Sequence, residues 1–396
     1  MELFEDMTIL SLEQATTLPY LTYRLAQDGM NVIRVEHPVY GDPNRMIGEN
    51  ILKEERMNSY YLCINAGKKA ITLNLAEDKG GDIFKELILK LKVDIFATNQ
   101  LPRNYAKLGV DYDTLKEIKS DIIWLGITGF GPDSNEPAYE PILQARSGLM
   151  DLTGEPDGEP QQLGIPLADM GTSEHAYGLL MKALLKRERT GQGSRIDISM
   201  LESATSWLTV PIAITATFGK KVTRSGNTHK FFAPVSVFNT KNGYVYIAVG
   251  NDRQWKAMVN LPPFQSLDRE EYEKNLGRIN DVANLNKSIG KIFPTLTSEE
   301  LIKRFNEIGL PISKINAVPE VLEDPLIQGE LLKSRDAQSG IELTHAPPPF
   351  MTPFLKHSNK SLSFPPRFGE HNSKIYCTVL DYSESDLIDF KEKGII

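Results

Sequence analysis

A carboxylate at the start of an expected helix is the first candidate for chemistry. The segment GIPLADMGTSEHA, residues 164–176, places Asp169 between an apolar approach and small residues that open a helix. An aspartate at such a position commonly caps the helix by accepting a backbone N–H bond. The apolar approach limits hydration, and a carboxylate at a helix N-terminus can also be a nucleophile, with nearby N–H groups such as that of Gly171 as donors. The sequence therefore leaves Asp169 as either a helix cap or a nucleophile.

Other catalytic arrangements have little support in the sequence. The six histidines are scattered, with neither an HExxH motif nor paired CxxC spacing, so we expect no metal site. A G-x-S-x-G motif for a serine hydrolase is absent. Cys63 and Cys377 lack basic neighbours, which favours packing roles for both, and two cysteines in such a chain indicate a reducing compartment.

Charge and hydropathy limit the class of partner. The net charge of −8 is spread along the chain, and basic clusters such as residues 186–189 are interrupted by acids, which argues against nucleic acid. The first residues form no basic leader, and no apolar run approaches membrane-spanning length. We therefore expect a cytoplasmic protein with a small-molecule partner and without a membrane or nucleic-acid partner.

Short apolar runs alternate with helical patterns over residues 1–130. This alternation predicts a parallel sheet covered by helices on both faces. No G-x-G-x-x-G follows the first run, where the turn reads LEQATTLP, so a dinucleotide site loses its main requirement. Strands are expected at 7–13, 31–38, 68–75, 93–98 and 121–130, and helices at 17–29, 80–92 and 103–119.

The rest of the chain contains a long helix, a hairpin and a charged helical region. Residues 170–186 have helical spacing, and residues 195–208 indicate a strand that leads into a helix. The hairpin FFAPVSVF–NTKNG–YVYIAVG is expected to turn at Asn242-Gly243, with positive φ angles there. We expect a second domain from residue 222 to about 325, and a terminal helix capped by Ser383.

Several motifs occur together in one characteristic order. They resemble the family III CoA-transferases, also called the CaiB/BaiF family, which includes formyl-CoA transferase. The motifs are VIRVEHPVYGDPNR (32–45), NAGKKAITLNL (65–75), KLGVDYDTL (107–115), GITGFGP (126–132), AYEPILQARSGLMDLTG (138–154), PLADMGTSEHAYGLLMKALLKRERTGQGSRIDISML (166–201) and AVGNDRQW (248–255).

The resemblance implies an α/β fold and a particular assembly. A large Rossmann-like domain with a parallel sheet would span residues 1–221 and be completed by the return segment 326–396, and residues 222–325 would form a smaller α+β domain. The family resemblance also implies an interlocked homodimer. The family's P-x-x-D-x-x-x-G pattern falls on Pro166 and Asp169, with Ser173 in place of the glycine.

The resemblance further implies the chemistry. Asp169 would be the nucleophile that passes through mixed anhydrides and an aspartyl-CoA thioester, Glu140 would orient it, and Tyr139 would lie beside the thioester. Coenzyme A is then part of the substrate, and no metal or permanently bound cofactor is needed. The implied CoA-binding positions are Thr16, His37, Arg45, Leu73, Asn74, Leu75, Ala76, Asn99, Lys107, Gly250 and Asn251.

Three departures from the family pattern argue against formate and oxalate as substrates. The frequent NFRPG motif reads NQLPR here, Thr16 stands where formyl-CoA transferase has a glutamine, and the GND loop at 250–252 resembles the version found in members other than the formyl and oxalate enzymes. The predicted function is transfer of CoA from an acyl-CoA, such as succinyl-CoA or another dicarboxylyl-CoA, to a small carboxylic acid. Alternatives are an α-methylacyl-CoA racemase or an intramolecular CoA transfer on the same fold, a CoA-binding protein without turnover, and an atypical dinucleotide oxidoreductase. Racemisation requires bases that move a proton, and the racemase branch has a histidine where this sequence has Tyr139. A racemase is therefore disfavoured, because a tyrosine with an ordinary pKa of ~10 is a poor base at neutral pH.

Overall fold

Six parallel strands form the sheet at the centre of the fold, in a computed structural model that describes residues 3–396. The strand order is β3-β2-β1-β4-β5-β6, and every neighbouring pair is parallel. The order reverses between β1 and β4, where the carboxyl ends of the strands open a crevice in doubly wound sheets. The predicted α/β fold with a parallel sheet is confirmed. The strands are β1 Thr8–Leu12, β2 Asn31–Glu36, β3 Lys69–Thr72, β4 Ile95–Thr98, β5 Ile123–Thr128 and β6 Ser194–Ser199.

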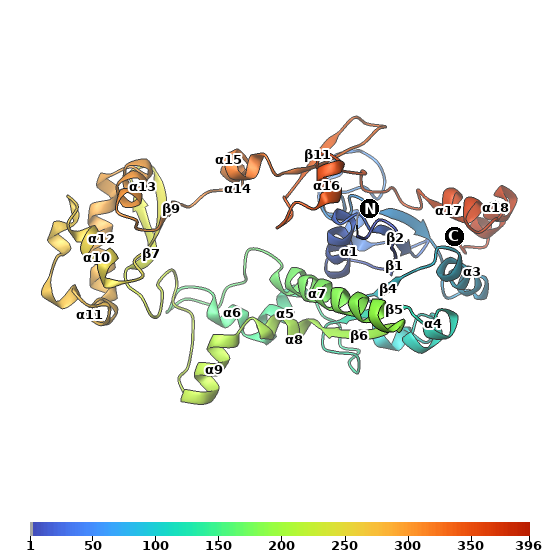
Figure 1. Ribbon diagram of the computed structural model, residues 1–396, viewed down its shortest axis with the longest axis horizontal. Coiled ribbons are helices and arrows are strands. Elements are labelled where there is room, and N and C mark those ends of the chain that lie inside the picture. The colour runs from blue at the N-terminus through green and yellow to red at the C-terminus, as the bar shows by residue number, and fades with distance from the viewer. Residues whose placement is uncertain (1–2) are drawn as a thin grey trace. The chain divides into compact units, whose positions relative to one another are not determined.

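Internal contacts divide the chain into two units (Figure 1). The first unit holds the parallel sheet and consists of residues up to Leu149, Leu163–Ile212 and Gly329–Ile396. The second consists of Met150–Gln162 and Ala213–Gln328. The last part of the chain returns to the first unit, where Tyr382 donates a hydrogen bond to Glu86 on the helix α3, Asp78–Lys90.

Helices pack on the parallel sheet through a largely aliphatic core that includes the buried Trp124 and Phe96. The helices α1, Thr17–Gln27, and α7, Leu167–Thr190, pack against each other, which brings two distant parts of the sequence together. α1 ends at Gln27, two residues before the expected end, and Gly29 follows it with a positive φ of 91°. The remaining helices of this unit include α1 Thr17–Gln27, α2 Ser59–Cys63, α4 Tyr112–Ile118, α5 Glu140–Ser147, α7 Leu167–Thr190, α8 Met200–Ser206, α16 Pro353–His357, α17 Asn372–Thr378 and α18 Glu384–Glu392.

Small strands and boundary helices complete the description of the first unit. Ser383 caps α18 by accepting the N–H of Asp386, as predicted. The helices α6, Leu149–Leu152, and α9, Thr209–Phe218, each begin in the first unit and end in the second. A three-stranded sheet is formed by β10 Leu332–Arg335, β11 Glu342–His345 and β12 Ser361–Leu362.

One predicted helix is shorter than expected. Residues 103–119 were expected to be helical throughout, but α4 spans only Tyr112–Ile118, after a 3-10 turn at Pro102–Asn104. Gly109 has a positive φ of 64°, which interrupts the helix, and the Asp111 side chain then caps α4 by accepting the N–H of Thr114. The expectation that Cys63 packs in the interior is also wrong, because this residue is exposed.

The second unit contains an antiparallel sheet covered by helices. The strands β7 Val235–Thr240 and β8 Gly243–Ala248 form the predicted hairpin, and β9 Ile312–Lys314 joins β8. The turn differs from the prediction: Gly243 has a positive φ of 144°, whereas Asn242 fixes the turn through its side chain, whose Oδ1 accepts the N–H of Ser298. The helices are α10 Asp252–Val259, α11 Asn275–Asn280, α12 Val282–Ile292, α13 Ser298–Glu307, α14 Val318–Glu323 and α15 Pro325–Gln328.

A buried ionic cluster lies at the carboxyl end of β2. Arg34 is fully buried and forms ion pairs with Asp42 at 2.6 Å, Glu36 at 3.5 Å and Glu13 at 3.6 Å. Lys68 adds a contact to Glu13 at 3.0 Å. Buried charges are tolerated only when they are paired in this way, so the cluster fixes the loops that follow β1 and β2.

No helix among residues 3–396 is both long and apolar enough to cross a membrane.

Arg34→Met leaves three buried carboxylates short of a partner and should lower the free energy of unfolding by about 3–5 kcal/mol. Urea denaturation measures this loss. Arg146→Met is the matched control, because it removes an arginine that pairs with Glu136 on the surface, and the expected loss is about 0–1 kcal/mol. Equal losses in the two variants would contradict a stabilising role for the cluster.

Candidate active site

Asp169 is the third residue of α7 and does not cap it. The N-cap is Pro166, and no side chain of the capping residue bonds to the first turn. The N–H of Ala168, which a helix leaves without an internal partner, instead donates to Oε1 of Glu140 at 3.0 Å. Glu140, on α5, thus accepts a hydrogen bond from the first turn of α7, and the Asp169 carboxylate does not cap this helix.

Glu140 is itself held in place. It is buried, and its Oε1 also accepts from Nε2 of Gln144 at 2.8 Å, one turn along α5. Oε1 of Gln144 in turn accepts the N–H of Leu163 in the segment before α7. This chain of hydrogen bonds fixes α5 against the start of α7.

Thr17 contacts the Asp169 carboxylate directly. Its hydroxyl donates to Oδ1 of Asp169 at 2.5 Å, and its own carbonyl oxygen accepts from Ser173 Oγ at 2.5 Å. The family resemblance implied the neighbouring Thr16, and Thr17 was not among the predicted site residues. Two adjacent threonines at the start of a helix are the available signal, but the direction in which each points depends on how α1 packs on α7.

The environment raises the pKa of Asp169 from its ordinary value of 3.8 to about 6. Burial is the largest cause, because it disfavours the charged carboxylate, and the negative charge of Glu140 acts in the same direction. The hydrogen bond from Thr17 opposes both. The group is therefore ionised at neutral pH and more basic than an exposed aspartate, which suits a nucleophile.

Gly171 has a different role from the one expected. It lies inside α7, so its N–H belongs to the helical hydrogen-bond ladder and is not an open oxyanion donor. A Cβ added at this position would lie 2.9 Å from Nε1 of Trp207, which stacks on His175. The glycine makes room for this indole.

Thr16 and Tyr139 each directly precede a residue described above: Thr16 precedes Thr17, and Tyr139 precedes Glu140. Thr16 is buried and its Oγ1 lies 3.1 Å from the hydroxyl of Tyr60. Tyr139 directly precedes Glu140, and its side chain is 77% exposed. Tyr139 is thus open to solvent next to the buried Glu140.

A cleft of about 440 Å³ opens at the carboxyl ends of β1, β2 and β3. The structure brings together here many of the residues that the family resemblance implied for CoA. Lys107 is the one lysine or arginine that lines the cleft in the described part of the chain. The expected residues in its lining are His37, Leu73, Asn74, Leu75, Ala76 and Lys107.

His37 lines the cleft as a neutral ring. Its Nδ1 accepts the N–H of Val39 at 3.1 Å, and burial lowers its pKa from 6.5. The acceptor role of Nδ1 leaves Nε2 as the protonated nitrogen. His37 therefore offers a hydrogen-bond donor, without a positive charge, to a ligand in the cleft.

Arg45 is placed differently from the prediction. Its guanidinium is buried and forms two bonds to the Glu36 carboxylate, at 2.8 and 2.7 Å, and one to the Tyr61 hydroxyl. Its donors are used inside the subunit, so the expected contact between Arg45 and CoA has no support in this geometry. The GDPNR motif gave no sign that a buried acid, Glu36, lies within reach.

The other expected binding residues lie outside the cleft lining. The amide of Asn99 exchanges hydrogen bonds with the backbone of Gln14, so it supports the cleft wall formed by Gln14. Gly250 and Asn251 belong to the second unit. There Asn251 caps α10 by accepting the N–H of Gln254, and the N–H of Gly250 donates to the Gln254 side chain.

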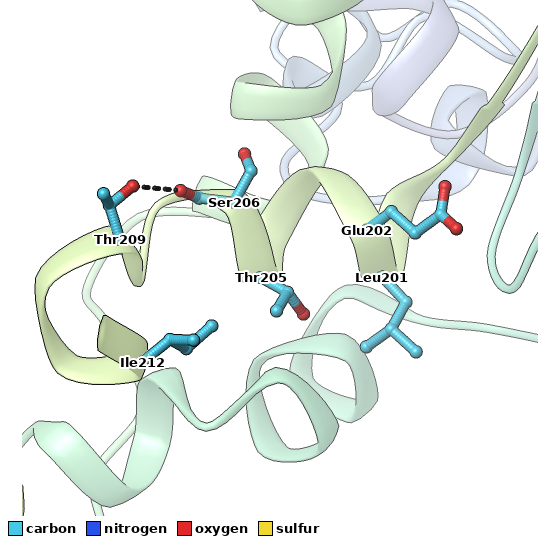
Figure 2. A pocket seen from close by; sticks show the side chains of 6 residues that line it. All are labelled: Leu201, Glu202, Thr205, Ser206, Thr209 and Ile212. Carbon is cyan, nitrogen blue, oxygen red and sulfur yellow. Dashed lines mark hydrogen bonds between the residues drawn. The ribbon is translucent and has the colours of Figure 1, made fainter. Parts of the chain in front are cut away.

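A second hollow of about 470 Å³ lies on α8 and the start of α9. Figure 2 shows its lining side chains, with Thr209 hydrogen-bonded to the carbonyl of Ser206. No residue of α9 is buried in the described chain, although its sequence TVPIAITATF is almost entirely apolar. The lining residues are Leu201, Glu202, Thr205, Ser206, Thr209 and Ile212.

The fold and site together define a class of enzyme. The parallel sheet has the strand order of doubly wound nucleotide-binding folds, with a cleft at its carboxyl edge. A partly buried carboxylate of raised pKa lies at the start of α7, and an acid with a pKa shifted in this way marks a candidate catalytic site.

The sequence matches CoA-transferase family III over residues 4–372, and the chain therefore belongs to this family and is a CoA-transferase. It is 31% identical to the succinyl-CoA:glutarate CoA-transferase of Mus musculus, covering all of this chain and 91% of that protein. It is 30% identical to the succinyl-CoA:mesaconate CoA-transferase of Haloarcula marismortui, covering 85% and 86% of the two chains. The crystal structure of a CaiB/BaiF family protein from Brucella suis superposes with a TM-score of 0.82, at 28% identity over 94% and 98% of the two chains. The family and enzyme class predicted from the sequence are confirmed.

The raised pKa of Asp169 makes its charge costly to the folded state. Because the folded-state pKa of about 6 lies above the ordinary 3.8, the folded protein binds more protons between these values, and stability falls as pH rises through them. Asp169→Asn should therefore raise Tm at pH 8, by on the order of 1–2 °C, and have little effect below pH 4. Differential scanning calorimetry at the two pH values measures this, with Asp82→Asn, on the surface of α3, as control. An Asn variant that is less stable at pH 8 would contradict the assignment.

Proposed function

We propose that this enzyme transfers CoA from succinyl-CoA, or another dicarboxylyl-CoA, to a small carboxylic acid through an aspartyl-CoA thioester on Asp169. The observation that carries the proposal is the Asp169 carboxylate, which is free of helix capping and has a raised pKa. The relatives named for succinyl-CoA with glutarate or mesaconate support the substrate class. A succinate–glutarate CoA-transferase of Agrobacterium fabrum, 28% identical over 93% of both chains, supports it as well.

The proposed reaction conserves the energy of the thioester. The Asp169 carboxylate attacks the thioester carbonyl, the C–S bond breaks, and a mixed anhydride and the CoA thiolate form. The thiolate attacks the carbonyl carbon of Asp169 and expels the donor acid as a carboxylate, which leaves CoA on the enzyme. An incoming carboxylate then reverses both steps and leaves as the new CoA ester.

Glu140 and Tyr139 have distinct proposed roles. Glu140 orients the nucleophile, since its bond to the N–H of Ala168 fixes the first turn of α7. Tyr139 is exposed beside it and suits a contact with the substrate. Thr16 lies next to Thr17 and suits a position along the path of the thioester.

The cleft at the sheet edge is the proposed site for the nucleotide part of CoA. Carboxyl edges of doubly wound sheets bind nucleotides, and the lining segment Leu73–Ala76 supplies backbone and apolar surface. The neutral His37 provides a donor, and Lys107 provides the positive charge for phosphate. We assign no CoA contact to Arg45, and the roles of Gly250 and Asn251 stay predictions.

We also propose a homodimer of interlocked chains that works in the cytoplasm without a permanently bound cofactor. The surface of α9 supports dimerisation: Val210, Ile212 and Phe218 are all exposed large apolar side chains. Apolar surfaces of this kind commonly mark protein contacts. Racemisation is not favoured, because the relatives reported above are CoA-transferases.

Incubation with succinyl-CoA should attach CoA to Asp169, and hydroxylamine should convert the adduct to a hydroxamate on the same peptide. Peptide mass spectrometry locates the modification. Asp169→Ala should lose at least about 10³-fold in transfer rate, because it removes the nucleophile. Near-normal turnover by the alanine variant would refute the mechanism.

Lys107→Ala should raise the KM for succinyl-CoA by about tenfold with little change in kcat, the loss expected for one hydrogen bond to a charged group. Initial rates over a range of succinyl-CoA concentrations measure both constants. The control is Lys116→Ala, an exposed lysine of α4 that does not line the cleft. An unchanged KM in the Lys107 variant would remove this residue from the proposed CoA site.

A further inference from the structure

One hydroxyl is directed at one oxygen of the Asp169 carboxylate. Thr17 Oγ1 donates to Oδ1 at 2.5 Å, a length typical of a bond between a hydroxyl and an ionised carboxylate. Within residues 3–396, Oδ2 accepts no hydrogen bond from the protein. The two oxygens are therefore distinct: within the described residues the protein donates a hydrogen bond to Oδ1 and none to Oδ2.

The position of Thr17 is fixed from more than one side. Its backbone carbonyl accepts from Ser173 Oγ at 2.5 Å, and the same serine hydroxyl lies 3.0 Å from the carbonyl oxygen of Asp169. Thr17 is buried, and its Oγ1 also lies 3.8 Å from the sulfur of Met200. The β-branched side chain of Thr17 has few rotamers, so its hydroxyl stays directed at Asp169 on α7.

Two backbone N–H groups in the first turn of α7 have acceptors other than Oδ1 of Asp169. The N–H of Ala168 donates to Glu140, and the N–H of Met170 donates to the carbonyl of Pro166. Gly171 lies in the helical ladder. A side-chain donor is therefore the group that the structure directs at Oδ1.

We propose that Thr17 is a catalytic residue that stabilises the oxyanion formed on Asp169 itself. This inference rests on the proposed aspartyl-CoA mechanism. When the CoA thiolate attacks the Asp169 carbonyl carbon, a C–S bond forms, and the electron pair of the C=O bond moves to Oδ1. When that pair returns, the C–O bond to Oδ2 breaks, and the donor acid leaves as a carboxylate that carries this oxygen.

The same oxygen bears the charge a second time. The acceptor carboxylate attacks the aspartyl thioester at the same carbon, and the tetrahedral adduct again places negative charge on Oδ1 before the thiolate leaves. A donor fixed in advance on that oxygen strengthens its bond as the charge develops, without reorganisation. Thr17 thus serves both halves of the transfer with one hydroxyl.

The test compares Thr17→Val, Thr17→Ala and Thr17→Ser with wild-type enzyme, using succinyl-CoA and glutarate from pH 5 to 9. The valine and alanine variants should lose about 10²–10³-fold in kcat on the alkaline plateau, as for removal of one oxyanion donor. The acid limb of kcat/KM should also move to higher pH. The Thr17 hydrogen bond lowers the pKa of Asp169 in the wild type, so its removal raises that pKa. Thr17→Ser keeps the hydroxyl and should recover most of the rate.

Thr172→Val is the matched control. It removes a different buried hydroxyl, which lies on α7. That hydroxyl donates to the carbonyl of Ala168 and does not contact the Asp169 carboxylate. Its plateau rate and acid limb should match those of the wild type. Thermal unfolding of all variants identifies any that do not fold, and the alanine variant then replaces the valine variant.

A plateau kcat within about threefold of wild type in the valine or alanine variant overturns the role of Thr17, because one hydrogen bond to a charged group contributes more than that. The same holds if the rate falls with no movement of the acid limb and no recovery by serine. Failure of the underlying mechanism shows itself separately, as full transfer by Asp169→Ala. In that case the assignment of Thr17 falls with it.

Discussion

The bond between Glu140 and the N–H of Ala168 is the interaction on which the site depends. A helix N-terminus needs acceptors for its free N–H groups, and the nearest carboxylate in the sequence, Asp169, would ordinarily supply one. Glu140 supplies it from a different helix, at 3.0 Å, and its place is secured by Gln144. A capping carboxylate gains a hydrogen-bond partner and loses basicity. Asp169 avoids this loss because the acceptor comes from α5.

The second constraint is the buried ionic cluster beneath the loop before α1. Oδ1 of Asp42, an ion-pair partner of Arg34, accepts the N–H of Ala15, and the side chain of Asn44 donates to the carbonyl of Ala15. These bonds hold Ala15 at a φ of 61°, a left-handed conformation that a residue with a Cβ adopts at a cost. The chain then enters α1 directly at the two threonines. The charges packed under the sheet edge therefore fix the direction in which Thr17 faces α7.

The sequence predicted most of the elements that carry the site, because the strands of a parallel sheet are apolar and the helices between them are periodic. The family resemblance implied His37, Leu73 and Lys107 as CoA positions, and all three line one cleft, where His37 and Leu73 directly follow β2 and β3. Prediction from the sequence failed where the outcome depends on packing between distant segments. Arg45 became a buried partner of Glu36, and Thr17, not Thr16, faces Asp169. No local pattern distinguishes two adjacent threonines or shows which buried acid an arginine will meet.

In the proposed mechanism, the raised pKa of Asp169 also determines how the mixed anhydride breaks down. The thiolate can attack either carbonyl of the anhydride, and the less basic carboxylate is the better leaving group. Simple carboxylic acids have pKa values of about 4, whereas burial and Glu140 raise that of Asp169 to about 6. Expulsion of the donor acid is then favoured over expulsion of Asp169, which directs CoA onto the enzyme. Burial alone would raise the pKa further and leave less nucleophile at neutral pH, and the hydrogen bond from Thr17 opposes that rise. Burial, with Glu140 adding to it, and Thr17 therefore act in opposite directions on the pKa of one carboxyl, and their balance keeps it both ionised and more basic than the acids it exchanges.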